Sequence, residues 1–253
     1  MKLERRNQII NMIKEKRTVK NSELMECFDI SIETVRRDLE YLEQQGYLKR
    51  VYGGAVLNVT LTGEPEYARR SKELSAEKTS IAAEAAKLIN PTDAVYLGVG
   101  TTVEAMAQYI KDIGQLTVFT NALRIAIELS NASDCTVILP GGQLRSKELT
   151  LSGFPAEDNF AHFNVDKAFI GIGGITETSI TDFHIAEAQL HRQLIKNARQ
   201  AIVLADFSKL GIQAVVNVCP LEDVDIVITD NKAPTHIVKA IEQAGVQVIV
   251  AKA

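Results

Sequence analysis

The sequence has no tryptophan, few aromatic residues and no long hydrophobic run. Aromatic side chains make up 6% of its 253 residues, while hydrophobic side chains make up 46% and charged ones 24%, a balance that excludes a disordered or fibrous protein. No apolar stretch approaches the roughly 20 residues that a membrane-spanning helix needs. The first residues are charged and do not resemble a signal peptide. We therefore expect a globular, cytoplasmic protein without a membrane segment.

The sequence is also poor in residues that form disulfides or hold metals. Its three cysteines, Cys27, Cys135 and Cys219, are far apart and in no CxxC spacing, so neither a disulfide framework nor a zinc cluster is indicated. Its four histidines include no i, i+4 pair and no HExxH motif, which argues against a metal-dependent enzyme. We expect a reducing compartment, no metal site and no cofactor.

Charge is distributed unevenly along the chain. The net charge is −4, yet residues 1–57 carry 11 Lys and Arg against 9 Asp and Glu, a net +2, and the other 196 residues carry 17 against 23, a net −6. Such an asymmetry suggests that one part of the chain meets a polyanion and the other does not. Because an excess of two charges is small, the arrangement of residues within the first part has to decide whether this part meets a polyanion.

Three helical patterns and a glycine turn occupy residues 1–57. Apolar residues at helical spacing predict helices over 4–16 and 21–28, and a third pattern, SIETVRRDLEYLEQQG, begins at an N-cap residue, Ser31, and closes at Gly46. The alternating stretch YLKRVYGGAVL then breaks at two glycines and predicts a short two-stranded wing. Together these elements predict a winged helix-turn-helix, in which the second helix of the pair enters the major groove of DNA.

The third predicted helix has an apolar face and a charged face. At about 100° per residue, Val35, Leu39 and Leu42 fall on one side, and Arg36 and Arg37 fall on the other. On an isolated helix such a charged face is typical of a solvated surface. Its position between a tight helical turn and a basic wing favours DNA binding instead.

The exposed side chains have chemistries that suit DNA. Arg36 and Arg37 can bind guanine O6 and N7 or phosphate, and the sequence does not show which arginine reads a base. Hydroxyls at the helix start can reach phosphates or base edges, and the basic wing residues can hold the flanking backbone. Glu33 can accept from cytosine N4 or remain a solvated side chain. The predicted DNA-binding residues are Ser31, Glu33, Thr34, Arg36, Arg37, Lys49 and Arg50.

The rhythm of the sequence changes after this segment. Residues 58–74 are polar, contain Pro65 and predict a linker between a DNA-binding domain over 1–57 and a second domain over 75–253. In the second domain short apolar strands alternate with helical patterns, as in a parallel sheet with crossover helices. Strands are predicted at 93–98, 116–120, 135–140, 167–172, 200–205, 224–229 and 246–251, and helices at 75–89, 101–110, 121–130, 185–198 and 234–245.

Glycine and polar residues follow several of these strands, and ligands of open parallel sheets lie beyond the carboxyl ends of the strands. Gly100, Thr101 and Thr102 lie where a strand meets a helix, so their backbone amides predict an anion site, with a simple strand-to-helix turn as the alternative. A dinucleotide site is not favoured, because Val103 stands where the third glycine of GxGxxG is required. The other strand ends contribute Thr120, Asn121, Gly141, Gly142, Asp166 as a hydroxyl acceptor, and Lys209 as a point charge.

The first domain resembles the DNA-binding signature of DeoR-type bacterial transcriptional regulators, which is S-x-x-T-[VI]-R-R-D-L followed by L-x-R-x-H-G-G-A. The matching residues are Ser31, Thr34, Val35, Arg36, Arg37, Asp38, Leu39, Leu48, Arg50, Gly53, Gly54 and Ala55. The resemblance adds Tyr52 and Gly53 to the predicted DNA-binding residues. Tyr52 stands where the family commonly has histidine, so a wing contact by that side chain is in question.

The second domain resembles the DeoR-type sensor domain, which is related in fold to ribose-5-phosphate isomerase and CoA-transferase-like proteins. The matching residues are Glu77, Lys78, Ile81, Ala82, Gly100, Thr101, Thr102, Thr120, Asn121, Gly141, Gly142, Asp166, Phe169, Ile170, Gly171, Glu187, Ala188, Asp206, Ser208, Lys209 and Gly211. The resemblance implies a repressor of a carbohydrate or polyol catabolic operon that responds to a phosphorylated sugar. It implies an effector site of Gly100, Thr101, Thr102, Asn121, Gly141, Gly142, Asp166, Glu187 and Lys209.

The sensor sequence departs from the family pattern at two places. Gly98 and Val99 stand where the family usually has D-S, and Phe207 replaces a serine of D-S-S-K. These departures remove two polar contacts and leave the identity of the effector open.

One alternative remains open, a sugar-phosphate isomerase-like enzyme that carries a DNA-binding module. Asp166, Glu187 and Lys209 are of the acid-base types that an isomerase uses. The winged helix favours regulation, because a turnover enzyme gains nothing from holding its substrate on an operator. A regulator of this kind is expected to bind double-stranded DNA as a homodimer or homotetramer, since a single winged helix buries little DNA surface.

Overall fold

The computed structural model describes residues 2–16, 18–44, 47–57, 64, 66–132 and 134–252. The chain forms two compact units, Met1–Thr60 and Leu61–Ala253. Each unit is described separately below. The predicted end of the third helix at Gly46 and the proline of the predicted linker, Pro65, lie outside the described residues.

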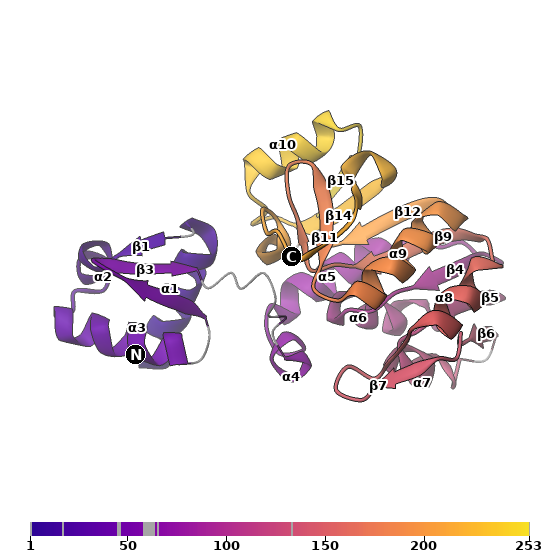
Figure 1. Cartoon of the computed structure of the whole chain (residues 1–253), viewed down its shortest axis with the longest axis horizontal. Coiled ribbons are helices and arrows are strands. Elements are labelled where there is room, and N and C mark those ends of the chain that lie inside the picture. The colour runs from indigo at the N-terminus through magenta and orange to yellow at the C-terminus, as the bar shows by residue number, and fades with distance from the viewer. Residues whose placement is uncertain are drawn as a thin grey trace. The chain divides into compact units, whose positions relative to one another are not determined.

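The first unit is a winged helix-turn-helix, as predicted (Figure 1). Three helices are followed by two strands that pair antiparallel, and a third strand precedes the second helix and joins the wing in the order β1-β3-β2. The elements are α1 (Lys2–Lys16), β1 (Thr18–Lys20), α2 (Asn21–Phe28), α3 (Ile32–Gln44), β2 (Leu48–Val51) and β3 (Gly54–Leu57). The sequence did not predict β1, because three residues are too few to show a strand period.

Glycine at position 54 allows β1 and β3 to pair. A Cβ atom on Gly54 would lie 2.1 Å from the carbonyl oxygen of Val19, so any larger residue would push the two strands apart. Gly53, at the preceding position, has a φ of 82° in the turn between β2 and β3, a backbone conformation that glycine adopts readily.

One apolar core holds the first unit together. It combines one face of each helix with inward-facing wing residues, and its buried members are Ile9, Ile10, Ile13, Val19, Leu24, Val35, Leu39, Leu42, Leu48 and Ala55. Each large aliphatic side chain in such a core contributes about 1.5–3 kcal/mol by leaving water. The predicted apolar face of α3 is therefore confirmed as the face that packs inward.

The second unit is built on a seven-stranded parallel sheet with the order β15-β14-β12-β9-β4-β5-β6 (Figure 1). All six neighbouring pairs run parallel. The strands are β4 (Ala94–Leu97), β5 (Leu116–Thr120), β6 (Cys135–Ile138), β9 (Val165–Gly171), β12 (Ala198–Leu204), β14 (Ile226–Asp230) and β15 (Gln247–Ala251). These are the seven predicted strands, so the α/β prediction is confirmed.

Helices cover both faces of this sheet, because successive strand residues point to opposite sides. Tyr96 packs in one buried cluster, and its neighbours Val95 and Leu97 pack in the other. One cluster includes residues of α5 (Ser75–Ala86), α6 (Thr101–Ile110) and α7 (Leu123–Leu129). The other includes residues of α8 (Phe154–Ala161), α9 (Ile185–Asn197) and α10 (Thr235–Gln243).

Several short elements were not predicted from the sequence. A hairpin precedes α8, and an antiparallel three-stranded sheet in the order β10-β11-β13 lies outside the main sheet. These elements are β7 (Gln143–Arg145), β8 (Thr150–Ser152), β10 (Gly174–Ile175), β11 (Ser179–Asp182), β13 (Val216–Pro220), α4 (Tyr67–Arg70) and the 3-10 turns η1 (Phe207–Lys209) and η2 (Leu221–Asp223). None of these is longer than five residues, which is too short for periodicity to reveal. The eight-residue helix α8 was not predicted either.

The sheet changes its direction of growth at β4. The chain adds β5 and β6 on one side of β4 and then returns to place β9 on the other side. Ligands of open α/β sheets bind beyond the carboxyl ends of the strands at such a switch point. The backbone is closely packed there, because a Cβ atom on Gly171 would lie 2.3 Å from the carbonyl oxygen of Val99.

The described part of the predicted linker belongs to the second unit. Glu64 and the short helix α4 make side-chain contacts with Glu104, Glu148 and His184 of that unit. Among the described residues, no helix is both long and apolar enough to cross a membrane.

Candidate functional site

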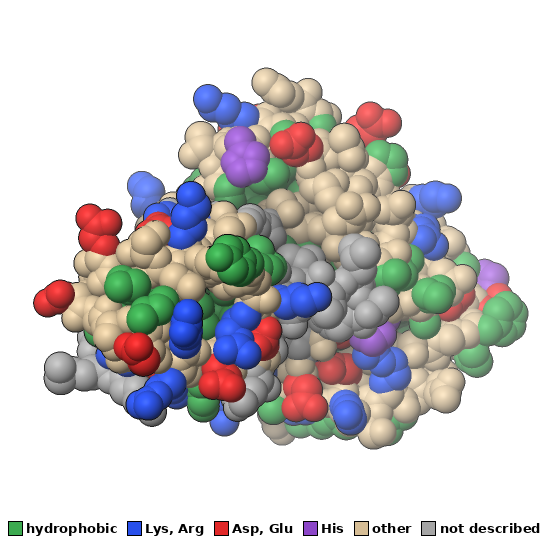
Figure 2. Space-filling model, turned by 60° about the vertical axis from the view of Figure 1, so that its left-hand side comes forward, with side chains coloured by type: hydrophobic (Ala, Val, Ile, Leu, Met, Phe, Trp, Pro, Cys, Tyr) green, Lys and Arg blue, Asp and Glu red, His purple; other side chains and the backbone are tan. Residues whose placement is uncertain are grey.

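The face of α3 opposite the core exposes two neighbouring arginines. Arg36 and Arg37 are exposed, whereas Val35 and Leu39 beside them are buried. Within the part of the chain that the structure describes, neither guanidinium has an ion pair or hydrogen bond. Figure 2, in which this unit has come forward, shows Lys and Arg side chains interspersed with acidic ones on its surface. Two unneutralised guanidiniums on a helix of this length suit a polyanionic partner.

The next residue of the motif, Asp38, has the opposite role. Its carboxylate is 1% exposed and is held by Arg5 at 2.6 Å and by Arg6 at 2.7 Å, so it joins α3 to α1. The guanidinium of Arg6 also stacks over the ring of Tyr41, with its carbon 3.7 Å from the ring centroid. The R-R-D sequence of α3 therefore places two cations outside and one structural anion inside.

The beginning of α3 is capped by its own side chains. The Ser31 hydroxyl accepts a hydrogen bond from the Thr34 backbone amide at 3.4 Å and lies 3.2 Å from the Thr34 hydroxyl. The predicted N-cap is confirmed, and it satisfies one of the amides that a helix start leaves free. Glu33 lies between them and is exposed.

The predicted residues of the wing differ in their exposure and contacts. Lys49 is exposed, and Tyr52 at the turn is fully exposed. Arg50 is bound to the carboxylate of Glu43 at 2.7 Å, and its backbone amide donates to the same group at 2.8 Å. These contacts hold the pKa of Glu43 below its ordinary value and raise that of Arg50. The charge of Lys49 is therefore less compensated than that of Arg50.

In the second unit, the predicted anion site lies at the start of α6, beyond the carboxyl end of β4. Gly100 precedes the helix with a φ of 137°, and Thr101 and Thr102 form its first turn. Amides of a first helical turn have no partners within the helix, so they are available to bind an anion. Glu104 in the same turn accepts a hydrogen bond from the Tyr67 hydroxyl at 2.6 Å, and burial raises the pKa of Glu104.

Asn121 and Gly142 lie at neighbouring strand ends. Asn121 is fully buried, accepts from the Tyr96 hydroxyl at 2.7 Å and donates to the Leu151 carbonyl at 3.1 Å. Its side chain therefore supports the β8 segment as well as the site. A Cβ atom on Gly142 would lie 2.7 Å from the Ser152 carbonyl, so glycine is required for the hairpin to close there. Gly141 has a φ of 73° and open space around it.

The expected position of Asp166 is wrong. It is the second residue of β9 and accepts from the backbone amide of Ala94 at the start of β4, at 3.0 Å. Because the strands are parallel, this is the amino edge of the sheet, opposite to the edge that carries Gly100. Asp166 also faces Arg199 at 3.3 Å. The sequence analysis grouped the whole stretch VDKAFIGIGG with the strand ends of the site, but Asp166 lies at the beginning of this strand, which ends at Gly171.

Lys209 lies at the carboxyl edge, in the turn η1 after β12, where it is half-buried. The preceding Asp206 caps this turn by accepting from the Ser208 amide at 2.9 Å. Lys78, at the start of α5, lies within electrostatic range of both Asp206 and Lys209, and burial lowers the pKa of its ammonium group. Lys78 was matched to the family signature but was not predicted as a site residue.

Glu187, at the start of α9, forms the centre of a buried polar group. Its carboxyl is bound by Arg145 of β7 and lies 3.5 Å from the Thr150 hydroxyl. Burial raises the pKa of Glu187 to about 8, the nearby Asp182 carboxylate adds to this effect, and Arg145 opposes it. Arg145 also lies 3.0 Å from the Nε2 atom of His184.

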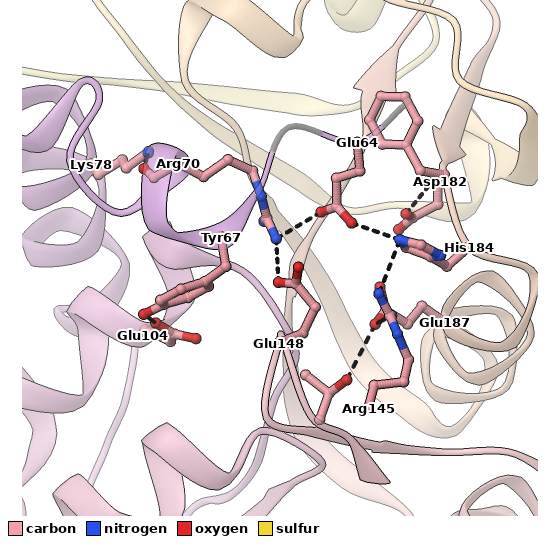
Figure 3. A network of polar contacts seen from close by, with 12 residues as sticks. Glu64, Tyr67, Arg70, Lys78, Glu104, Arg145, Glu148, Asp182, His184 and Glu187 are labelled. Carbon is pink, nitrogen blue, oxygen red and sulfur yellow. Dashed lines mark hydrogen bonds and ion pairs between the residues drawn. The ribbon is translucent and has the colours of Figure 1, made fainter. Parts of the chain in front are cut away.

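Glu64, Arg70 and Glu148 extend this group, as Figure 3 shows, and the sequence reasoning missed all three. Arg70 binds Glu64 at 2.9 Å and Glu148 at 2.5 Å, and Glu64 lies 2.7 Å from Nε2 of His184. Arg70 lies in a charged run within the predicted linker, where nothing distinguishes it from a solvated residue. Among the described residues, no three His, Cys, Asp or Glu side chains are grouped so as to hold a metal ion.

Comparison with known families agrees with both units. The DeoR-like helix-turn-helix domain matches residues 5–60, and the DeoR C-terminal sensor domain matches residues 73–231. The chain belongs to the DeoR family of transcriptional regulators. It is therefore a DNA-binding regulator and not an isomerase-like enzyme.

Relatives of similar length support this assignment. The HTH-type transcriptional regulator GolR of Listeria innocua is 34% identical over 98% of this chain and 98% of its own. The glycerol-3-phosphate regulon repressor of Escherichia coli is 33% identical over 96% of this chain and 97% of its own. The HTH-type transcriptional repressor GlcR of Bacillus subtilis is 33% identical over 98% and 95%.

Solved structures resemble the chain only distantly. Ribose 5-phosphate isomerase A from Methanocaldococcus jannaschii matches with a TM-score of 0.39 and 18% identity over 53% of each chain. A similarity this low does not bear on activity.

Proposed function

We propose that the protein is a repressor of a carbohydrate or polyol catabolic operon, and that a phosphorylated sugar releases it from its operator. It acts on DNA in the cytoplasm. Relatives named as repressors of a glycerol-3-phosphate regulon and of an aga operon support the choice of repressor and of ligand class. The observation that carries the proposal is the start of α6, whose amides lie at the switch point of the sheet.

In the proposed complex the phosphate binds the amides of Gly100, Thr101 and Thr102, and Lys209 adds a charge-assisted hydrogen bond. A helix start favours an anion by about 0.3–1 kcal/mol, so the lysine is needed as well. The sugar hydroxyls lie toward Asn121, the Gly141–Gly142 turn and Glu187. Asp166 has no part in this site, because it lies at the other edge of the sheet.

On the DNA side, Arg36 and Arg37 read or hold the major groove, and Lys49 holds the adjacent backbone. A single winged helix covers one half-site, so we propose that a homodimer or homotetramer binds paired half-sites. By linkage, an effector that lowers DNA affinity by some factor binds the DNA complex more weakly by the same factor.

The test is a DNA-release assay with a panel of phosphorylated sugars and polyols, comparing wild type with Lys209→Ala. Lys239→Ala is the matched control, because Lys239 is an exposed lysine of α10 with no described ion pair. We expect Lys209→Ala to stay on the operator at effector concentrations that free wild type and the control. Equal release by all three proteins removes Lys209 from the site. No release of wild type by any phosphorylated compound contradicts the proposed effector class.

A further inference from the structure

Glu64 fills a position in which its carboxylate is held from two sides. One oxygen lies 2.9 Å from a guanidinium nitrogen of Arg70, and the other lies 2.7 Å from Nε2 of His184 (Figure 3). The Glu64 side chain is only 16% exposed. Arg70 comes from α4 and His184 directly precedes α9, so two distant segments converge on this one carboxylate. The arrangement is that of an anion-binding site with an internal occupant.

The cation that holds Glu64 is already compensated. Arg70 binds two carboxylates, those of Glu64 and Glu148. An additional anion at Arg70 therefore meets no uncompensated charge. It can enter only by displacing a carboxylate, because an unpaired charge in such a partly buried site is costly.

The network adjoins the proposed phosphate site. Arg70 acts electrostatically on Glu104 in the first turn of α6, and Tyr67 of the same short helix bonds to Glu104 at 2.6 Å. On its other side, the Arg70 backbone carbonyl accepts a hydrogen bond from Lys78, whose ammonium group interacts with Lys209. Arg70 thus acts electrostatically on Glu104 in the first turn of α6 and on Glu187 of the proposed site, and it is also a ligand of Glu64.

Glu64 is better placed to leave than the other acid on Arg70. Glu148 is 9% exposed and lies between the two strands of the β7–β8 hairpin. Glu64 lies a few positions after Thr60, the last residue of the winged-helix unit, and precedes a helix of only four residues. Moving Glu64 therefore does not require the sheet or its hairpin to move.

We propose that Arg70 and His184 form a second anion subsite, separate from the one proposed for the phosphate at the start of α6, that Glu64 occupies this subsite in the effector-free protein, and that a further anionic group, for which inorganic phosphate is the probe, displaces it. The inference rests on the proposed function for the nature of the ligand. The exchange breaks both described contacts of the Glu64 side chain. A phosphate dianion is favoured over a carboxylate because it offers more acceptor oxygens and more charge to an arginine fork.

The test measures binding of inorganic phosphate to the full-length chain by calorimetry in chloride buffer at constant ionic strength. Glu64→Gln removes the internal competitor, and Glu66→Gln is the matched control, because Glu66 is exposed and its side chain has no described contact. We expect Glu64→Gln to bind phosphate at least about fivefold more tightly than wild type, since releasing one charged contact is worth about 1 kcal/mol or more. Glu66→Gln should stay within about twofold, and acetate should bind each protein more weakly than phosphate does.

A second variant covers the case in which Glu64→Gln lowers the melting temperature and does not fold well. His184→Gln keeps Glu64 and Arg70 but removes one arm of the subsite, and it should weaken phosphate binding, while His236→Gln on exposed α10 should not. Wild-type affinity in Glu64→Gln overturns the competition, and wild-type affinity in His184→Gln removes His184 from the subsite. Absence of phosphate binding by every form overturns the subsite altogether.

Operator release separates this inference from the proposed function. Suppose that a phosphorylated sugar frees wild type and Glu64→Gln from the operator at the same concentration, and that the two proteins bind phosphate equally. The proposed effector class is then supported, and competition by Glu64 is contradicted. If Glu64→Gln binds phosphate more tightly than wild type but no phosphorylated sugar releases wild type from the operator, the anion subsite is supported and the proposed effector class is contradicted.

Discussion

The two units of the chain use arginine in opposite ways. In the winged helix, Arg36 and Arg37 are exposed and have no described partner, whereas in the sensor Arg70 and Arg145 are largely buried and bound to acidic side chains. Free surface charge suits a polyanion, because binding neutralises phosphates and releases their counterions. Buried, balanced charge suits a small anion, which must exchange with a carboxylate to enter. DNA would add negative charge beside the exposed arginines of the first unit, whereas a small anion would replace a carboxylate in the second.

The largest expected effect tests Asp38, a buried anion of the DNA-binding unit. Asp38→Ala leaves Arg5 and Arg6 without their carboxylate and should lower the free energy of unfolding of the winged helix by about 2–4 kcal/mol. Chemical denaturation followed by circular dichroism measures this change. Glu40→Ala, an exposed acid on the same helix, is the control and should change stability by less than about 0.5 kcal/mol. Equal stability of the two variants would show that Asp38 is not structural.

The next effect concerns the exposed arginines of that helix. Arg36→Ala and Arg37→Ala should each weaken operator binding by about 1–3 kcal/mol if the arginine makes a bidentate base contact. Both face away from Val35 and Leu39, so the melting temperature should not change. Binding titrations at fixed salt measure the loss. Wild-type affinity in both variants would contradict the assignment of α3 as the recognition helix.

The sensor's buried acid predicts a pH dependence of stability. The folded protein keeps the Glu187 proton up to a pH of about 8, because burial raises its pKa, while the unfolded chain releases it above its ordinary value of 4.5. Stability should therefore fall from about pH 5 to about pH 8, by on the order of 1 kcal/mol per pH unit, and level off above.

Glu187→Gln should make this slope shallower in thermal or chemical unfolding; the partly buried Glu104, whose pKa is also raised, contributes to what remains. Glu177→Gln, at an exposed position in the same unit, should keep it. The same slope in wild type and Glu187→Gln would place the titrating group elsewhere.

The smallest expected effect separates two neighbouring wing residues. Lys49→Ala should reduce the slope of log affinity against log salt by about one phosphate contact. Arg50→Ala should change it less, because Glu43 already compensates the Arg50 charge at 2.7 Å. Operator titrations at several salt concentrations compare the two. A larger change for Arg50→Ala would show that DNA displaces Glu43.

The sequence predicted what depends on local periodicity. The apolar face of α3, the Ser31 cap, the glycine turn of the wing and all seven strands of the parallel sheet follow from patterns within single segments. The motif R-R-D, however, did not show that Asp38 is buried by arginines from another helix.

The polar network of the sensor could not be predicted in this way. Glu64, Arg70, Arg145 and Glu187 belong to separate segments, and only the folded chain brings them together. The prediction for Asp166 failed because this residue stands at the amino end of its strand, whereas the proposed site lies beyond the carboxyl end, which β9 reaches at Gly171. The glycines around the hairpin, such as Gly142, are the only sequence signal near Arg145. They indicate a tight turn, but they do not show which residues Arg145 binds.

The most direct test of the account is one binding titration. DNA selected by the wild-type protein from a random pool is titrated at fixed salt, with and without each member of a panel of phosphorylated sugars, and with the unphosphorylated sugar as control. The account predicts that at least one phosphorylated sugar raises the dissociation constant about tenfold or more, a coupling of about 1.4 kcal/mol, and that its unphosphorylated form does not. An unchanged dissociation constant with every phosphorylated sugar would contradict it.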